Sequence, residues 1–134
     1  MEPIELHGLE LLEVWSKADP GERVRFTFPI SRDTGATGAS VAYAELPSGG
    51  AIPRHHDTAN EVVLVMEGMV EFEVDGSRST VGEGRLVQIP SSAWHRVANA
   101  GNETARLLFY FDAAADVVTF EHPLMPLDQS VLGG

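Results

Sequence analysis

Hydrophobic and polar residues alternate along most of the chain with a period of two, which is typical of β-strands that bury one face. Residues 24–28 carry Val, Phe and Phe between Arg and Thr, and residues 70–74 carry Val, Phe and Val between glutamates. Short breaks rich in Gly, Pro, Asn and Asp separate these segments at nearly regular intervals. The strands predicted in this way are residues 24–28, 41–46, 62–66, 70–74, 85–89, 95–97, 105–111 and 117–120.

Some segments carry more specific expectations. The run over 62–66 is continuously apolar and rich in valine, so we expect a strand that is buried on both faces. Glu67-Gly68 follows it and predicts a hairpin with the strand over 70–74. Residues 6–17 fit neither the helical nor the strand period, so both structures stay open there. The Pro-containing tail over 122–134 is expected to wrap the surface or a partner subunit.

Many short strands without a clear amphipathic helix between them predict an all-β fold, which can be a sandwich, a jelly roll or a small barrel. A length of 134 residues is short for two independent cores, so a single domain over residues 1–134 is expected. Its core would span about residues 22–121, with an N-terminal arm before it and a C-terminal tail after it.

Composition narrows the range of partners and compartments. Acidic residues number 20 and basic residues 9, which gives a formal charge of -11, so neither nucleic acid nor an anionic membrane surface is expected as a partner. The sequence contains no cysteine, which excludes disulfides and cysteine-ligated metals and fits a reducing compartment. No apolar run is long enough to span a membrane, and residues 1–5 are acidic where a signal peptide would be basic. A cytoplasmic location is therefore expected.

Three histidines lie near the ends of predicted strands. His55, Asp57 and Glu61 share parity in an extended chain, so their side chains would leave the same face, whereas His56 would point the other way. A turn between Asp57 and Glu61 can reset this parity, so the relation of His55 to Asp57 is the better determined one. His95 would be carried to these residues by the sheet. Imidazole nitrogen and carboxylate oxygen together suit iron, manganese, zinc, nickel or copper.

These residues form a pattern that resembles the two signature motifs of the cupin superfamily. The first motif sets a glycine, two histidines, a glutamate and a second glycine at fixed spacing, and its places are taken here by Gly49, His55, Asp57, Glu61 and Gly68. The second motif sets a glycine, a proline, a glycine, a histidine and an asparagine, and its places are taken by Gly84, Pro90, Ser92, His95 and Asn99. Asp57 stands where the family has its second histidine, and Ser92 stands where it has the middle glycine.

The resemblance implies a small single-domain cupin, which is an all-β, cupin-type jelly-roll barrel and commonly a homodimer. It also implies one divalent transition metal inside the barrel. Carried over position by position, His55, Glu61 and His95 would be ligands, and Asp57 would occupy the fourth place. The sequence does not distinguish between iron, manganese, zinc and nickel.

The aspartate in the fourth place leaves three arrangements open. Asp57 can bind the metal, which adds a second carboxylate and makes a divalent ion a weaker Lewis acid. It can instead lie behind the ligands and accept an N–H from one of the histidines, which leaves two histidines, one carboxylate and open positions. A register shifted by one residue would put His56 in the fourth place and Arg54 in the first. We favour the arrangement in which Asp57 lies behind the ligands or binds the metal only weakly. The arrangement with His56 in the fourth place ranks second.

The remaining candidates have simpler interpretations. His7, His56 and His122 are each expected at the surface, and the acidic residues within 67–75 are expected on a solvated strand face. Aromatic residues are expected to fill the core rather than line the mouth of a barrel. These aromatic residues are Tyr43, Phe72, Trp94, Phe109 and Phe111.

A metal inside an apolar barrel predicts a site for a small molecule. We expect a metal-dependent enzyme acting on a small organic molecule, such as a phenolic or polyketide-like ring, whose enol or hydroxyl-carbonyl pair the metal would chelate. Iron would favour a dioxygenase, and zinc or another non-redox ion would favour a cyclase or isomerase of the polyketide-cyclase type. Glu61 or Asp57 would serve as the general base.

A non-catalytic small-molecule-binding or sensor cupin is the alternative, and the departures at Asp57 and Ser92 favour it slightly. The other ligand places are kept at full spacing, which counts against it because unpaired buried ionisable groups are costly. A cupin of the sugar-phosphate isomerase type would need several basic residues around a phosphate, and only Arg54, Arg96 and Arg106 are candidates.

Overall fold

The structure of the chain is a computed structural model that describes residues 2–133, and most of these residues lie in β-strands. The strands are β1 (Leu12–Ser16), β2 (Arg23–Ile30), β3 (Ser40–Leu46), β4 (Ala51–Asp57), β5 (Glu61–Glu67), β6 (Met69–Val74), β7 (Ser77–Gly82), β8 (Leu86–Ile89), β9 (His95–Asn99), β10 (Ala105–Phe111), β11 (Val117–Met125) and β12 (Gln129–Gly133). Two short 3-10 helices, η1 (Leu6–Gly8) and η2 (Arg32–Thr34), lie outside them. The expectation of an all-β fold is confirmed. Among the described residues, no helix is both long and apolar enough to cross a membrane.

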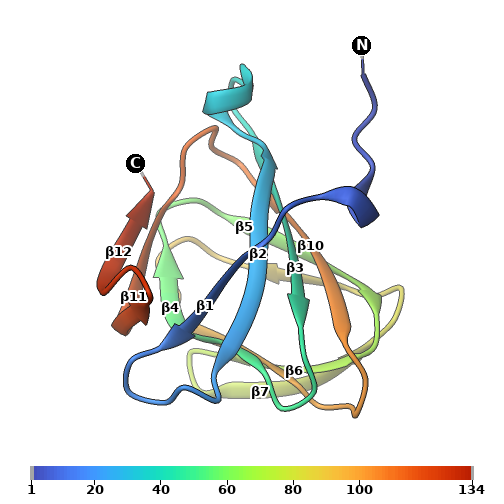
Figure 1. Cartoon of the computed structure of the whole chain (residues 1–134), viewed down its shortest axis with the longest axis vertical. Helices are drawn as coiled ribbons and strands as arrows, with labels where there is room; N and C mark the ends of the chain where they lie inside the picture. The colour runs from blue at the N-terminus through green and yellow to red at the C-terminus, as the bar shows by residue number, and fades with distance from the viewer. Residues whose placement is uncertain (1, 134) are drawn as a thin grey trace.

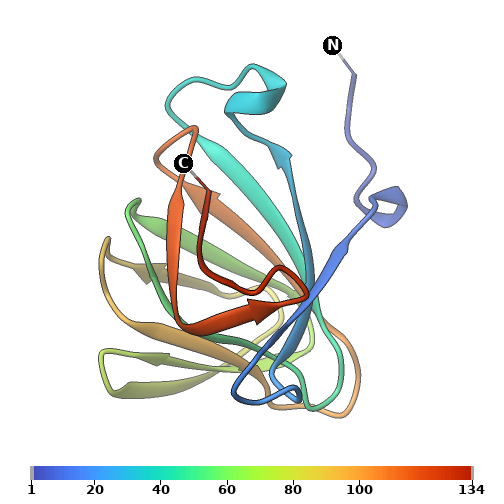
Figure 2. The ribbon, with the colours of Figure 1, turned by 60° about the vertical axis from the view of Figure 1, so that its left-hand side comes forward.

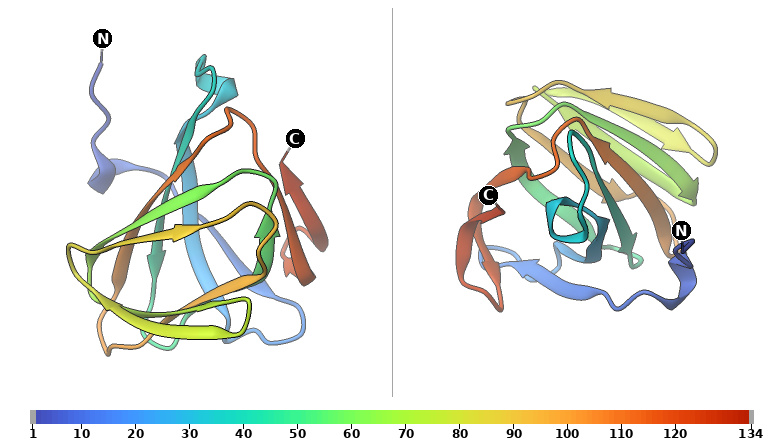
Figure 3. Two further views of the ribbon diagram at one scale, coloured as in Figure 1. Left: turned by 180° about the vertical axis from the view of Figure 1, so that it is seen from behind. Right: turned by 90° about the horizontal axis from the view of Figure 1, so that it is seen from above.

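The strands form a single curled sheet (Figure 1). Their order is β7-β6-β9-β4-β11-β1-β2-β3-β10-β5-β8, and β12 pairs with β11 outside this path. Strands β1, β2, β3, β10, β5 and β8 make one layer, which we call the first layer, and the others make the second layer. The two layers curl around a common interior (Figure 3), as expected of a cupin-type jelly roll.

The period of two in the sequence sets which side chains enter this interior. Strand β5 buries Val63 and Val65 inside, and β10 buries Leu107 and Phe109. Apolar side chains of the two layers meet there and form one continuous core.

The chain does not form the predicted hairpin at Glu67-Gly68. Strand β5 pairs with β8 and β10 in the first layer, whereas β6 pairs with β7 and β9 in the second. Gly68 has a φ of 92°, and the position of its absent Cβ is 3.0 Å from the Cα of Ala105. This glycine therefore turns the chain from one layer to the other, a long-range step that a local turn signal does not distinguish from a hairpin.

The strand over residues 62–66 was predicted to be buried on both faces, and in the single chain this prediction is also wrong. Val62, Leu64 and Met66 point outward and are half-buried. Strand β5 therefore has an apolar outer face as well as an apolar inner face.

Both ends of the chain contribute strands. The open question over residues 6–17 resolves into η1 followed by β1, which pairs with β2 and β11. The last predicted strand is longer than expected, and the tail expected to wrap the surface instead continues β11 and adds β12. The two strands form a hairpin (Figure 2).

The close approach at Gly68 predicts a specific cost for a side chain there. We expect Gly68→Ala to lower the free energy of unfolding by about 3 kcal/mol, because the methyl group meets Ala105 in addition to adopting a left-handed backbone. Gly76→Ala is the matched control, since Gly76 also has a positive φ but has open space around its Cβ position, and it should cost about 1 kcal/mol. Urea denaturation measures both values, and equal losses would contradict the argument.

Candidate metal centre

Strands β4 and β9 place two histidines side by side. Inward positions of β4 alternate, so His55 and Asp57 both enter the interior, as the shared parity predicts. His95 is the first residue of β9 and is the direct cross-strand partner of His55. Their ring centroids are 4.0 Å apart.

Backbone carbonyls set the orientation of both rings. The Nδ1 atom of His55 lies 2.7 Å from the carbonyl oxygen of Pro53, and the Nδ1 atom of His95 lies 2.8 Å from that of Ala93. Because a carbonyl oxygen only accepts hydrogen bonds, each Nδ1 carries the proton and donates it. The Nε2 atoms are therefore left as lone-pair donors that can face a metal ion.

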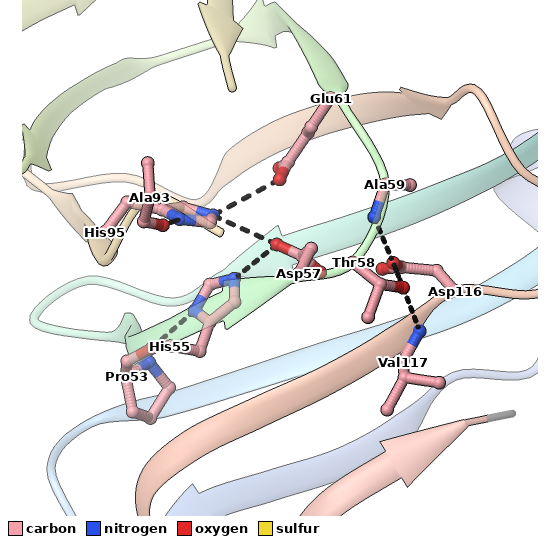
Figure 4. A network of polar contacts seen from close by, with 10 residues as sticks. All are labelled: Pro53, His55, Asp57, Thr58, Ala59, Glu61, Ala93, His95, Asp116 and Val117. Carbon is pink, nitrogen blue, oxygen red and sulfur yellow. Dashed lines mark hydrogen bonds and ion pairs between the residues drawn. The ribbon is translucent and has the colours of Figure 1, made fainter. Parts of the chain in front are cut away.

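Two carboxylates meet these nitrogens (Figure 4). Asp57 Oδ2 lies 3.5 Å from His55 Nε2 and 3.4 Å from His95 Nε2. Glu61, the first residue of β5, places Oε2 3.2 Å from His95 Nε2. One ligand atom from each of the four residues lies within 4.8 Å of all the others, and every one of the residues is buried.

These atoms fit a bound cation. Asp57 Oδ2, Glu61 Oε2 and His95 Nε2 are buried and have no hydrogen-bond partner among the described residues. Leaving such groups unpaired is costly, and the set of two imidazoles and two carboxylates is one that divalent transition metals accept. His55, Asp57, Glu61 and His95 could therefore hold one metal ion.

Burial and mutual repulsion perturb the acid–base behaviour of the cluster. Burial, aided by repulsion from His95, lowers the pKa of His55 to about 3. Burial also opposes charging of His95, but the Glu61 carboxylate, the Ala93 carbonyl and Asp116 together outweigh burial and raise the pKa of His95. The pKa of Asp57 is raised far above its ordinary value by burial and by the neighbouring carboxyl groups of Asp116 and Glu61.

His56 lies outside the cluster, on the opposite face of β4. Its ring meets Trp94 edge-on at 4.5 Å, and the guanidinium of Arg54 covers the same indole at 4.4 Å. Trp94 is thus held on the outer surface, contrary to the expectation that it fills the core. The register shifted by one residue is not the one that the strand adopts.

Ser92 and Asn99, two positions of the second motif, have structural roles. Ser92 has a φ of 68°, a left-handed conformation that a glycine adopts more easily, as the family pattern has it. Its N–H donates to the carbonyl oxygen of Asp57 at 2.8 Å, which ties the turn before His95 to the end of β4. Asn99 Nδ2 donates to three backbone carbonyls, so this residue supports loops rather than the metal cluster.

Two residues that support or adjoin the cluster, Asn60 and Asp116, carry no recognisable sequence signal. Asn60 donates to the Asp112 carboxylate from its backbone N–H and from its side-chain Nδ2, and its Oδ1 accepts from the N–H of Ser91. These bonds join the turns before Glu61 and His95. Asp116 is buried next to the cluster, and its Oδ1 accepts from Thr58 Oγ1 and from the N–H of Ala59. Asp116 lies in an alanine-rich turn outside both motifs, so only proximity in space reveals it.

The cluster forms part of the wall of an apolar cavity of about 330 Å³. His55, Asp57, Glu61 and Asp116 are the polar side chains that line it among the described residues. Its aromatic lining consists of Phe26, Phe28, Phe109, Phe111 and Phe120. Tyr43, Phe72, Phe109 and Phe111 are all buried in the core, as predicted, and Phe109 and Phe111 also line this cavity.

Comparison with known proteins agrees with this geometry. A family model described as a cupin domain matches residues 42–111. The chain belongs to the cupin family. The match covers both histidines, Asp57 and Glu61, so the family and the candidate metal centre coincide in the sequence.

Similar proteins come from several sources. The chain is 32% identical over 89 residues to polyketide synthase CurC of Streptomyces cyaneus and 32% identical over 82 residues to protein SchB of Streptomyces halstedii. These alignments cover 66% and 60% of this cupin and span 58% and 59% of the two relatives. A protein described as a predicted oxalate decarboxylase from Thermotoga maritima shares the fold, with a TM-score of 0.74 and 18% identity over 84% of this chain and 99% of its own.

The raised pKa of Asp57 predicts how stability depends on pH when metal is removed by a chelator. Between its ordinary value of 3.8 and its raised value, Asp57 binds a proton in the folded state that the unfolded state releases. Stability from this group is therefore lost as pH rises above about 4. We expect Asp57→Asn to raise the free energy of unfolding of the metal-free protein by about 1–3 kcal/mol at about pH 8, with a smaller gain at about pH 4.

Urea denaturation at both pH values measures this gain. Glu103→Gln is the control, because Glu103 is an exposed carboxylate far from the cluster, and it should change stability little at either pH. A loss of stability in Asp57→Asn at the higher pH would contradict the prediction.

Proposed function

We propose that this cupin is a metal-dependent enzyme that acts on a small, phenolic or polyketide-like organic molecule. The observation that supports the proposal most directly is the position of the cluster. Three of the four residues with metal-ligand chemistry, His55, Asp57 and Glu61, line a cavity whose other walls are mainly apolar and aromatic. Such a cavity admits a planar ring and brings one edge of it to the cluster.

His55, Glu61 and His95 would hold one divalent ion, with Asp57 as a fourth or weak ligand. The ion would supply Lewis acidity that lowers the pKa of a bound enol or phenol hydroxyl. Glu61 or Asp57 would take the proton that this hydroxyl releases, since both carboxylates face the same interior. The apolar walls would exclude water from the reacting ring.

The similarity to CurC, which is named a polyketide synthase, supports the proposed class of substrate. The chain spans less than three fifths of that relative, so the support concerns the barrel and its cavity. A dioxygenase and a cyclase or isomerase both fit this cavity, and the metal would decide between them.

A non-catalytic binding or sensor protein is the second candidate. The observation in its favour is Asp57, because a second carboxylate would neutralise a divalent ion and weaken its Lewis acidity. The same cavity would then bind the aromatic molecule without converting it.

Metal content tests the proposed ligands. We expect about one equivalent of transition metal per chain, and His95→Ala and Glu61→Gln should each weaken metal binding by at least about a hundredfold. His56→Ala is the matched control, because His56 is adjacent in sequence but faces Trp94, and it should keep full metal content. Elemental analysis of untagged protein measures these values, and loss of metal in His56→Ala with retention in His95→Ala would contradict the assignment.

The reaction is tested on the same metal-loaded protein. Two compounds, a polyhydroxylated naphthalene and a naphthol that carries an open β-diketone side chain, are each incubated with it under air and under nitrogen, and products are followed by mass spectrometry. Oxygen-dependent gain of two oxygen atoms would indicate a dioxygenase, and oxygen-independent loss of water from the β-diketone, as its side chain closes a ring by aldol condensation, would indicate a cyclase. Binding of the ring without any product would leave the binding protein as the function.

We also propose a homodimer formed through the outer face of the first layer. Cross-strand neighbours Tyr110 and Val62, and Leu64 and Leu86, make this face apolar, and Leu86 is 67% exposed. The N-terminal arm projects from the barrel beside this layer (Figure 1). Ion pairs lie on the outer face of the second layer, such as that of Arg78 with Glu73, and on β2 and β3 of the first layer, such as that of Arg25 with Glu45, so the apolar patch is confined to β5, β8 and β10. A second copy of the chain is the partner that fits, because one apolar face pairs with itself around a twofold axis.

Light scattering tests this assembly. We expect the wild type to have the mass of a dimer and the double variant Leu86→Glu/Tyr110→Glu to have that of a monomer, because two charges would be buried in the interface. Arg78→Glu, on the outer face of the second layer, should remain dimeric. A monomeric wild type would overturn the proposal.

A further inference from the structure

Asp116 is held rigidly at the cavity wall by one of its two oxygens. Its Oδ1 accepts from Thr58 Oγ1 at 3.1 Å and from the N–H of Ala59 at 3.1 Å. Thr58 Oγ1 in turn accepts from the N–H of Val117 at 3.1 Å (Figure 4). These bonds join the turn before Glu61 to the start of β11, so the carboxyl plane has little freedom to rotate.

The second oxygen of Asp116 is available to a bound molecule. Asp116 is only 7% exposed, it lines the apolar cavity, and its Oδ2 has no hydrogen-bond partner among the described residues. Asp116 interacts electrostatically with two members of the cluster, Asp57 and His95. A buried carboxylate oxygen without a donor is costly, so a hydrogen-bond donor brought by a ligand would be bound favourably.

The charge of the cavity restricts what that ligand can be. Asp57, Glu61 and Asp116 contribute three carboxyl groups, and no lysine or arginine is among the described residues that line the cavity. One divalent cation would balance at most two carboxylates. With such an ion bound, the site would be neutral if Asp57 carries a proton and negative if it does not, so it would offer no net positive charge to an anionic ligand, whereas a neutral hydroxyl needs none.

We propose that Asp116 determines substrate specificity, with Oδ2 accepting a hydrogen bond from a hydroxyl group of an uncharged aromatic substrate and the carboxyl-rich wall excluding anions. This inference rests on the proposed function and narrows its substrate class to neutral, hydroxylated aromatic compounds. Small dicarboxylates such as oxalate are excluded, although a structural neighbour is described as a predicted oxalate decarboxylase. The shared fold does not extend to the charge of this wall.

Three naphthalene compounds separate the hydroxyl group from ring shape and charge. Naphthol carries the donor, methoxynaphthalene lacks it, and naphthoate carries a negative charge. Calorimetric titration of the protein as purified should show naphthol binding about 10–100 times more tightly than methoxynaphthalene, which is the value of a hydrogen bond to a charged group. Naphthoate and oxalate should bind more weakly than methoxynaphthalene or not at all.

Asp116→Asn removes the acceptor while preserving the anchoring bonds. Its amide oxygen can still accept from Thr58 and Ala59, but an N–H₂ group replaces Oδ2. The preference for naphthol over methoxynaphthalene should then fall to less than about threefold, with methoxynaphthalene affinity, metal content and thermal stability nearly unchanged. Asp112→Asn is the matched control, because Asp112 anchors Asn60 in the same loop but does not line the cavity, and it should keep the preference.

The outcomes separate this inference from the proposed function. Equal binding of naphthol and methoxynaphthalene to the wild type, or an unchanged preference in Asp116→Asn, would overturn the role of Asp116 and leave the metal-dependent function standing. Tight binding of oxalate would overturn the exclusion of anions. Failure of every naphthalene compound to bind would overturn both this inference and the proposed aromatic substrate.

Discussion

Burial of ionisable groups at one wall of the barrel is the constraint on which the rest of the structure depends. Two imidazoles and three carboxyl groups lie there beside aromatic side chains, away from water that would otherwise stabilise their charges. Among the described residues, one side-chain atom in each of Asp57, Glu61, His95 and Asp116 is buried without a hydrogen-bond partner. A cation, protons or a ligand must therefore satisfy them, which is why a site of this composition indicates function rather than stability.

The surrounding strands and turns are arranged to hold these groups against their mutual repulsion. Carbonyls of Pro53 and Ala93 orient the two rings, and the backbone bond from Ser92 to Asp57 ties the two motif segments together. Asn60 and Asp116 anchor the turn that carries the chain from β4 to Glu61. The site thus draws its precision from turns that are far apart in sequence and joined by side-chain hydrogen bonds.

The outer surface of the barrel is not uniform. Ion pairs lie on the second layer and on β2 and β3 of the first layer, while β5, β8 and β10 carry an apolar outer patch. The apolar run over 62–66 reflects this arrangement, because residues on both sides of one strand are apolar for different reasons. One set fills the core, and the other covers an outer face.

The sequence by itself determined the all-β class, most strand positions and three of the cluster residues, His55, Glu61 and His95, because period-two burial and motif spacing are local properties of the chain, while it left the fourth place open between Asp57 and His56. The sequence could not show which strands pair, so Glu67-Gly68 predicted a hairpin although Gly68 joins two layers. The position of Asp116 beside the cluster could not be predicted from the sequence for the same reason. Which β-strands become neighbours, and which distant side chains share a cavity, depends on contacts between segments far apart in the chain, and only the tertiary structure decides these.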